Sequence, residues 1–226
     1  MFQDFTSSSD PTLGAERVAK LRARLKKLGV DAVIVPRFDE HMGEYVPPSA
    51  ERLAWLTGFT GSAGWAIIGQ DKAALFVDGR YTLQAPTQVP TSIFDVVQIP
   101  ETAPAQWIIK ALGTGDRIGF DPWLHTRAGI ALLEEAFANA DITLKALPRN
   151  PVDEIWGSER PPVPLGPVAV QPLELAGVAA ADKIKDLQRR LREAAEDAVI
   201  LTLPDSIAWL FNIRGSDVKH NPTPLA

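Results

Sequence analysis

Side chains whose types and spacing could do chemistry are few in this chain. Its three histidines, His41, His125 and His220, stand too far apart in the sequence to share one helical face, as an HExxH zinc motif requires. There is no cysteine, which excludes thiolate ligands, cysteine nucleophiles and disulfides. No GxSxG nucleophile elbow, P-loop or dinucleotide-binding glycine motif occurs. The chain is therefore predicted to hold no metal ion and no catalytic residue, with each histidine exposed or bonded locally.

A glycine-rich run at residues 60–64, Thr-Gly-Ser-Ala-Gly, is the closest approach to a ligand-binding loop. A phosphate loop would continue with Lys and Ser or Thr and would open a helix, whose first amides bind the anion. Here the run leads into apolar residues that indicate a strand. A tight turn between a helix and a hairpin is the favoured interpretation.

Arg80, in the run Asp78-Gly79-Arg80-Tyr81, is the one candidate for binding a substrate. Its guanidinium stays charged and offers a planar fork of donors to a carboxylate or carbonyl group. The plainer alternative is that Arg80 pairs with the neighbouring Asp78 on the surface. Taken alone, the residue types favour that surface pair.

The segments around Arg80 indicate how it would be positioned. Apolar runs at residues 65–68 and 73–77 flank a short polar break, which predicts two buried strands joined as a hairpin. A short helix over residues 53–56 precedes the glycine run. Asp78 is expected to cap a helix through residues 82–84, because its carboxylate can accept from the first free amides.

The first 157 residues show strands alternating with helices, which predicts an α/β fold with a mixed β-sheet flanked by helices. Residues 1–13 are polar and are expected to form a loose arm. Thr126 can cap a helix that ends near residue 138. The remaining expected elements are a helix at 15–28 that Gly29 ends, a strand at 31–35, a long loop at 37–48, a strand at 93–99, a helix at 105–112, and strands at 117–120 and 142–147.

The proline-rich residues 158–172 divide the chain and are predicted to be a semi-rigid linker, because proline neither continues a helix nor pairs in a central strand. Beyond the linker the sequence repeats. The run Asp-Ala-Val-Ile at Asp197, expected to be a strand, repeats that at Asp31 with an offset of 166 residues. The run Ala-Trp-Leu around Trp209 repeats that around Trp55 with an offset of 154. The two ordered blocks indicate a duplicated module.

These patterns predict a first domain at residues 1–157, the linker at 158–172 and an incomplete second copy at 173–226. With 226 residues and 46% hydrophobic content, the chain can bury one full core and part of a second. An incomplete sheet leaves an open edge and an uncovered apolar face. Residues 173–226 are therefore expected to pack on the first domain, to pair with another chain or to be poorly ordered.

Several runs resemble the amino-terminal domain of the creatinase, prolidase and aminopeptidase P superfamily. The broad likeness is carried by residues 58–64, the hairpin and Phe-Val-Asp-Gly-Arg-Tyr at 76–81. Asn-Pro-Val-Asp-Glu-Ile-Trp at 150–156, residues 209–218 and His-Asn-Pro at 220–222 are similar to three-domain, cytosolic X-prolyl aminopeptidases. The resemblance implies a creatinase-type, ribonuclease H-like fold for the first domain.

The resemblance also implies an activity that this chain does not carry by itself. In such a metalloaminopeptidase, a separate catalytic domain holds two divalent metal ions, expected to be manganese, and hydrolyses the bond ahead of proline. Arg80 would point from the first domain toward that cleft and hold a peptide with proline at its second position. A homodimer is the implied assembly. The fragment alone is expected to be inactive.

The loop that carries His41, Glu44 and Tyr45 matches a His-x-x-Glu-Tyr run of these peptidases. The resemblance places this run near a domain or subunit contact. A plain surface loop is the alternative.

The amino-acid composition argues against nucleic acid and membranes as binding partners. The net charge is −5 with acids and bases interspersed, so no basic surface for nucleic acid or anionic membranes is expected. The amino terminus lacks the basic start and apolar run of a signal peptide, and no run approaches the ~18 apolar residues of a membrane span. A cytoplasmic protein is expected.

Two other functions remain open on the sequence. One is a stand-alone binding or assembly module of the same fold without peptidase activity. The other is a creatinase-like or prolidase-like enzyme, which the second module disfavours because those relatives carry a single amino-terminal domain.

Overall fold

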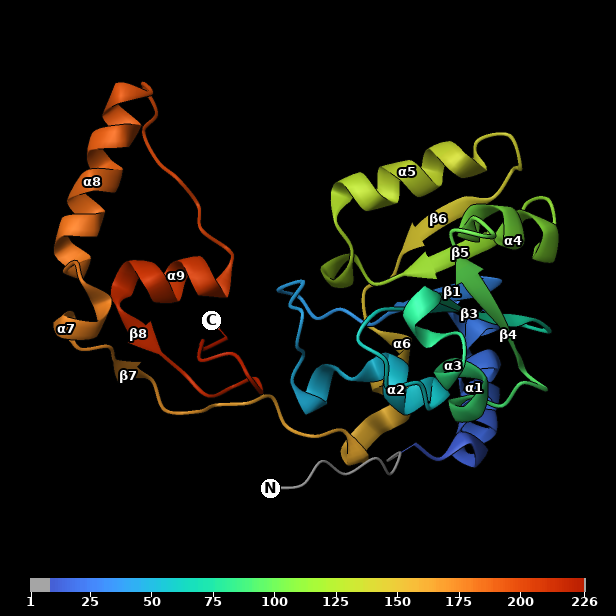
Figure 1. The fold of residues 1–226 in the computed structure, drawn as a ribbon. Helices are drawn as coiled ribbons and strands as arrows, with labels where there is room; N and C mark the ends of the chain where they lie inside the picture. Colours follow the sequence, from blue (N-terminus) through green and yellow to red (C-terminus); the bar gives the residue numbers. More distant parts are fainter. Residues whose placement is uncertain (1–8, 226) are drawn as a thin grey trace. The chain divides into compact units, whose positions relative to one another are not determined.

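The computed structural model describes residues 9–225, which form two compact units (Figure 1). The first unit consists of the described residues up to Glu40 together with Ala50–Pro161. The second consists of His41–Ser49 and the residues from Pro162 onward. The division at Pro161 lies within the stretch that the sequence marks as a linker.

A six-stranded mixed sheet forms the centre of the first unit, as predicted. Its strands are β1 (Ala32–Pro36), β2 (Trp65–Gly69), β3 (Ala73–Asp78), β4 (Phe94–Ile99), β5 (Arg117–Phe120) and β6 (Thr143–Ala146). They are arranged in the order β4-β3-β2-β1-β5-β6, and the pairs β1–β2 and β2–β3 are antiparallel while the others are parallel. The predicted hairpin is therefore β2–β3. Strand β1 is buried along its whole length, as expected for a central strand covered on both faces.

Helices cover both faces of this sheet (Figure 1). They are α1 (Pro11–Leu28), α2 (Arg52–Thr57), α3 (Gln84–Gln88), α4 (Pro104–Ala111), α5 (Arg127–Phe137) and α6 (Pro151–Trp156). On one face Leu21 of α1 and Leu56 of α2 pack in one core cluster with Ile68 of the hairpin. On the other face Ile108 of α4 and Phe137 of α5 belong to a second cluster.

Capping places the start of α1 earlier than the sequence pattern predicts. Asp10 accepts a hydrogen bond from the amide of Thr12, and Pro11 occupies the first turn, where its missing N–H costs nothing. The helix therefore begins at Pro11, and the expected loose arm was wrong for residues 11–13; residues 1–8 of that arm lie outside the described range. Gly29 ends the helix as predicted, with a left-handed φ of 65°.

Two further caps were assigned from the sequence. Thr126 caps α5 as predicted, accepting from the amide of Gly129 at 3.0 Å. Asp78 caps a different element from the one expected. Its carboxylate accepts from the amide of Arg80 and stabilises a 3₁₀ turn, Gly79–Tyr81, whereas α3 begins later, at Gln84, without a side-chain cap.

The second unit contains α7 (Leu173–Ala176), α8 (Ala180–Glu193), α9 (Pro204–Phe211) and an antiparallel ribbon of β7 (Ala169–Val170) with β8 (Ile213–Arg214). Strand β7 lies inside the predicted linker, so that segment does pair. Both strands of a two-stranded ribbon are edge strands. Edge strands tolerate nearby prolines, because one side of each strand needs no hydrogen-bond donors. Residues 197–200, expected to form a strand, do not form one, because no neighbouring strand is present in the described unit to bond with them.

Each unit contains the same kind of helix–helix contact, at positions that the sequence repeat makes equivalent. In the first unit Arg17 of α1 donates to the backbone carbonyl of Trp55, and its guanidinium carbon lies 4.5 Å from the centre of the Trp55 ring. In the second, Lys183 of α8 donates to the carbonyl of Trp209 at 2.7 Å, and its nitrogen lies 4.0 Å from that ring's centre. The offsets that relate these pairs are the 166 and 154 residues read from the sequence.

The two Trp-bearing helices also end alike. Helix α2 ends at Gly58 and α9 at Asn212, both in the left-handed conformation, with φ of 90° and 52°. Glycine and asparagine are the residues that adopt this cap most easily. The pairs α1–α2 and α8–α9 are thus built on one plan.

Candidate functional site

The glycine-rich loop before the hairpin is shaped by the ring of Phe59, which is almost fully buried. A side chain at Gly61 would overlap the far end of that ring and stand 2.8 Å from Cε1 of Tyr81. A side chain at Gly64 would stand 3.0 Å from Cε1 of Phe59. The glycines are therefore required by the close approach of aromatic rings.

Hydrogen bonds fix this loop to the turn that carries Arg80. The hydroxyl of Tyr81 accepts from the amide of Ser62 at 2.9 Å and is 2.7 Å from the Ser62 hydroxyl. The amide of Thr60 donates to Oε1 of Gln88 at 3.0 Å. Because these amides are already bonded within the protein, they do not point outward as a phosphate cradle would require. These bonds favour the interpretation of the loop as a structural connection between α2 and the hairpin.

Arg80 forms the surface pair that the plainer interpretation predicted. Its Nε lies 3.0 Å from Oδ1 of Asp78, and its Nη2 lies 2.7 Å from Oδ2. The hydrogen bonds from Arg80 hold the pKa of the Asp78 carboxyl below its usual range. The Arg80 side chain is 62% exposed, so exchanging Asp78 for another carboxylate would cost little. Its role in substrate binding stays a prediction.

The loop with His41, Glu44 and Tyr45 belongs to the second unit. The ring of Tyr45 lies 5.7 Å from that of His220, at a tilt of 60°. The two residues lie far apart in the sequence, and no pattern predicted their contact. The assignment of this loop to a domain or subunit contact stays a prediction.

Residues 150–156 form a structural joint. Asn150 caps α6 by accepting from the amide of Val152, and its amide group donates to the Asp121 carboxylate after β5. Asp153 forms two hydrogen bonds with Arg52 of α2, at 2.7 and 3.0 Å, and an ion pair with Arg160 at 2.8 Å. The motif therefore attaches α6 both to α2 and to the carboxyl end of a strand.

The rings of Trp156 and Trp55 stack with their centres 5.0 Å apart, which adds an apolar contact to the same joint. Arg52 is buried, with its side chain 7% exposed. Sequence reasoning missed its pairing with Asp153, because the two residues are 101 positions apart and neither lies in a pattern that names a partner.

A hollow of about 530 Å³ opens beside this joint, where β1, β5 and β6 end. The carboxyl edge of parallel strands is where α/β sheets place ligands. The acids here already have partners within the protein: Asp153 pairs with Arg52, Glu154 pairs with Arg24, and Asp121 accepts a hydrogen bond from the Asn150 amide group. This arrangement favours a structural role for the charged residues.

No group of three or more His, Asp or Glu side chains that could hold a metal ion occurs within residues 9–225. His125 is locally bonded, as expected, with Nδ1 2.8 Å from the carbonyl oxygen of Asp121. Burial lowers the pKa of its imidazole below the ordinary value. No helix in the described part of the chain is long and apolar enough to cross a membrane.

Two family models, both described as the creatinase/prolidase N-terminal domain, match the chain over residues 17–148 and 159–226. The chain belongs to the creatinase/prolidase N-terminal domain family. The first match falls on the first copy of the repeat, and the second covers the proline-rich stretch from residue 159 together with the second copy. Membership accounts for the mixed sheet and its flanking helices.

Relatives of this creatinase-type chain include a probable Xaa-Pro aminopeptidase P of Coccidioides posadasii, 38% identical over 98% of this chain and 34% of the relative. A second, from Pyrenophora teres f. teres, is 40% identical over 91% of the chain and 32% of the relative. Among solved structures, the cytosolic X-prolyl aminopeptidase of Caenorhabditis elegans, described as having a di-nuclear active site, matches 94% of this chain and 36% of its own, with 31% identity and a TM-score of 0.86. The chain spans about a third of the length of these relatives.

Proposed function

We propose that this chain is the non-catalytic, amino-terminal part of a metal-dependent X-prolyl aminopeptidase that releases the residue ahead of proline. The observation that carries the proposal is similarity along almost the whole chain, across both units, to relatives named for this activity. The di-nuclear site of the Caenorhabditis elegans enzyme supports two divalent metal ions, which we assign, as manganese, to the part that these relatives possess and this chain does not span.

Within that enzyme the chain would wall the active-site cleft and limit substrates to short peptides. Arg80 is the group proposed to touch the substrate, because its guanidinium is exposed and its bonds to Asp78 lie at the surface, where a substrate carboxylate could compete for them. The enzyme would be cytosolic, like its Caenorhabditis elegans relative, and a homodimer with the His41, Glu44 and Tyr45 loop near a contact. The segments 1–157, 158–172 and 173–226 would be its first domain, its linker and an incomplete second copy.

Replacing Arg80 with alanine in the full-length protein tests the proposed role. We expect KM for a peptide longer than three residues to rise about tenfold, the effect of losing one charge-assisted hydrogen bond, with kcat little changed. Peptide release from Xaa-Pro substrates is measured with manganese present.

Arg127→Ala is the matched control, because Arg127 is also an exposed arginine of the first unit but lies at the start of α5. Unchanged kinetics in Arg80→Ala would remove the role of Arg80 and leave the enzyme assignment standing. Full-length protein that cleaves no Xaa-Pro peptide would overturn the assignment itself. Cleavage by purified residues 1–226 alone would contradict the non-catalytic role.

A further inference from the structure

Tyr81, the residue after Arg80, has a ring that is fixed at two places. Its hydroxyl accepts from the amide of Ser62 at 2.9 Å and lies 2.7 Å from the Ser62 hydroxyl. The ring meets that of Phe59 nearly at a right angle, with the centres 5.3 Å apart and the planes at 87°. Phe59 is 1% exposed, so the close-packed core gives the Tyr81 ring a rigid neighbour. The tyrosine side chain is therefore held at its polar end and at its apolar body.

The loop that holds Tyr81 is itself fixed, through Thr60. Gln88 is 5% exposed, its Nε2 donates to the Thr60 hydroxyl at 2.8 Å, and its Oε1 accepts from the Thr60 amide at 3.0 Å. Gly61 follows, and a Cβ built there would stand only 2.8 Å from Cε1 of Tyr81. The loop thus has room for the tyrosine ring and keeps Ser62 in place against its hydroxyl.

This fixed ring lies beside the guanidinium of Arg80. The guanidinium carbon is 5.2 Å from the centre of the Tyr81 ring, within the roughly 6 Å at which a cation is attracted to an aromatic face. The contact occupies no N–H donor, whereas the pair with Asp78 occupies those on Nε and Nη2. A carboxylate that binds Arg80 would therefore compete with Asp78 for donors, but it would not compete with the ring of Tyr81.

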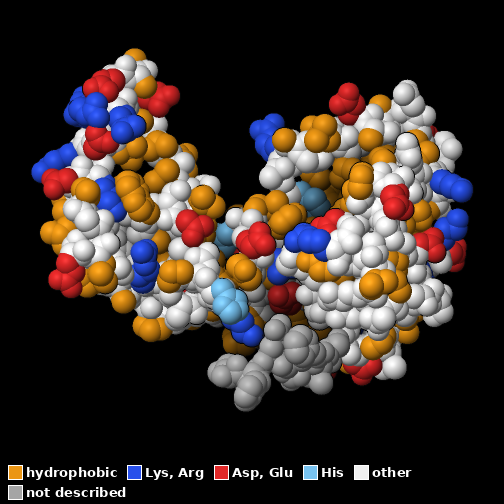
Figure 2. Space-filling view, in the orientation of Figure 1, with side chains coloured by type: hydrophobic (Ala, Val, Ile, Leu, Met, Phe, Trp, Pro, Cys, Tyr) orange, Lys and Arg blue, Asp and Glu red, His pale blue; other side chains and the backbone are white. Residues whose placement is uncertain are grey.

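The charge distribution makes the placement of such a cation important. The net charge of the chain is −5, and basic and acidic side chains are interspersed on the face drawn in Figure 2. This distribution gives no general attraction for an anionic group. A peptide carboxylate would depend on individual cations that are already in position, because ordering a free arginine side chain on binding costs free energy.

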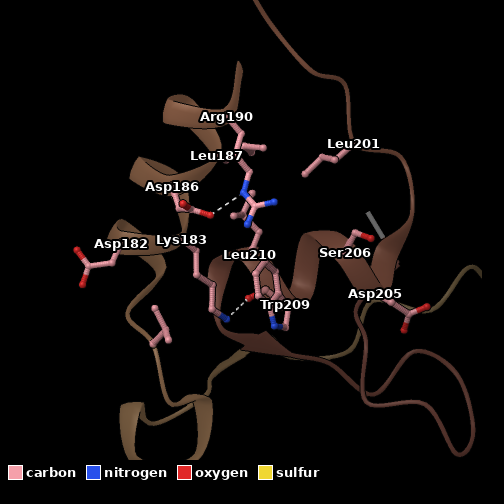
Figure 3. Close-up of a pocket in the computed structure, with 11 residues that line it drawn as sticks. Asp182, Lys183, Asp186, Leu187, Arg190, Leu201, Asp205, Ser206, Trp209 and Leu210 are labelled. Atoms are coloured by element: carbon pink, nitrogen blue, oxygen red, sulfur yellow. Dashed lines mark hydrogen bonds and ion pairs between the residues drawn. The ribbon is translucent and has the colours of Figure 1, made fainter. Parts of the chain in front are cut away.

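A contact of the same kind in the second unit has the features of a structural one. Lys183 lies 4.0 Å from the centre of the Trp209 ring and donates to the Trp209 carbonyl at 2.7 Å (Figure 3). Lys183 is 7% exposed, so its donors serve the interior of the unit. The side chain of Arg80 is 62% exposed, and its pair with a carboxylate lies at the surface. Tyr81 therefore holds a cation whose donors solvent can reach.

We propose that Tyr81 is a positioning residue for the binding of a peptide by Arg80. Its ring, fixed by Ser62 and Phe59, holds the guanidinium in place while the carboxyl terminus of the peptide replaces Asp78. Tyr81 thereby reduces the side-chain freedom that Arg80 loses on binding. This inference rests on the proposed function, which gives Arg80 its contact with the substrate.

The test is a double-mutant cycle in the full-length protein, with a four-residue peptide that has proline at its second position. Tyr81→Leu removes the ring, and we expect KM to rise about threefold with kcat little changed, the effect of losing a cation–π contact at an exposed site. Tyr81→Phe keeps the ring but loses the bond to Ser62, so its KM should lie between those of the wild type and Tyr81→Leu. In an Arg80→Ala background neither substitution should raise KM further, because Tyr81 acts through Arg80.

Phe137→Leu is the control for lost stability, because Phe137 is 1% exposed and packs in the core cluster on the other face of the sheet. The urea midpoint of every variant is measured alongside its kinetics. We expect Phe137→Leu to lower the midpoint and to leave KM unchanged, which separates a loss of positioning from a loss of stability.

A wild-type KM in Tyr81→Leu, or a rise that persists in the Arg80→Ala background, would overturn the role of Tyr81 and leave the enzyme assignment standing. A wild-type KM in Tyr81→Phe would overturn the anchoring of the ring by Ser62. Unchanged KM in Arg80→Ala alone would remove the substrate contact of Arg80, and with it the role of Tyr81. Full-length protein that cleaves no Xaa-Pro peptide would overturn the proposed function, and this inference would fall with it.

Discussion

Gly61 illustrates, at the scale of a single residue, how a motif glycine can be required by side-chain packing. Its backbone needs no left-handed conformation, yet a Cβ there would overlap Phe59 and approach Tyr81. Gly61→Ala should therefore destabilise the protein by about 1–3 kcal/mol, the usual cost of overpacking a core. The measurement is the urea midpoint at unchanged m.

Gly79→Ala is the control for Gly61→Ala, because a Cβ at Gly79 would meet no atom within 4 Å. Its effect should stay within about 0.5 kcal/mol, as for most surface changes. Equal destabilisation by both substitutions would show that backbone freedom, and not the packing around Phe59, is what the motif needs.

The sequence predicted the bonding partner of Arg80 only because that partner is a near neighbour in the chain. Asp78 lies two residues away, so their pair could be read from the run itself. The bond between Ser62 and Tyr81 joins residues 19 positions apart, and only the folded hairpin brings them together. The pair of Arg80 with Asp78 was therefore predictable from the sequence, whereas the hydrogen bonds that hold the turn in place were not.

At the scale of elements, the ion pair between Arg52 of α2 and Asp153 of α6 should contribute more to the stability of the fold than an exposed ion pair does. Arg52 is buried, and Asp153 is shared between Arg52 and Arg160. Asp153→Asn would leave a buried guanidinium without its counter-charge, which typically costs about 3 kcal/mol or more. Urea unfolding should show this loss.

Glu16→Gln is the comparison for Asp153→Asn. It removes an acid from the exposed pair with Lys20, whose side chains are 67% and 55% exposed. Exposed pairs of this kind contribute little to stability, because water screens the two charges. If the two substitutions destabilise the protein equally, the joint between α2 and α6 is not held by its buried charge pair.

Most strands and helices of the first unit follow from the spacing of apolar residues. The pattern at residues 65–77 predicted a hairpin because both strands are buried and the break between them is polar. It missed the start of α1, where capping by Asp10 outweighs the polar composition of the first turn. It also predicted a strand at residues 197–200, because a sequence pattern reports strand propensity but not whether a partner strand lies beside the segment.

At the scale of the whole molecule, the equivalent helix pairs α1–α2 and α8–α9 differ in whether they pack on a large β-sheet. Helices α1 and α2 pack on a six-stranded sheet, whereas in the described part of the second unit α8 and α9 are accompanied by the two-residue strands β7 and β8 alone. The contact of a cation with a tryptophan is present in both copies. Such a contact orients two helices, but the buried apolar area that stabilises them comes mainly from the sheet.

This difference predicts unequal protection within residues 1–226. Amides of β1–β3 should exchange slowest, because they open only with the main core, whereas those of residues 173–226 should exchange at least about 100-fold faster. The sharpest comparison is Leu56 with Leu210, equivalent positions of α2 and α9 that are 0% and 8% exposed and differ in the sheet behind them. Native-state hydrogen exchange on a verified monomer gives both rates. Equal protection of the two helices would mean that the pair α8–α9 is stabilised without a sheet.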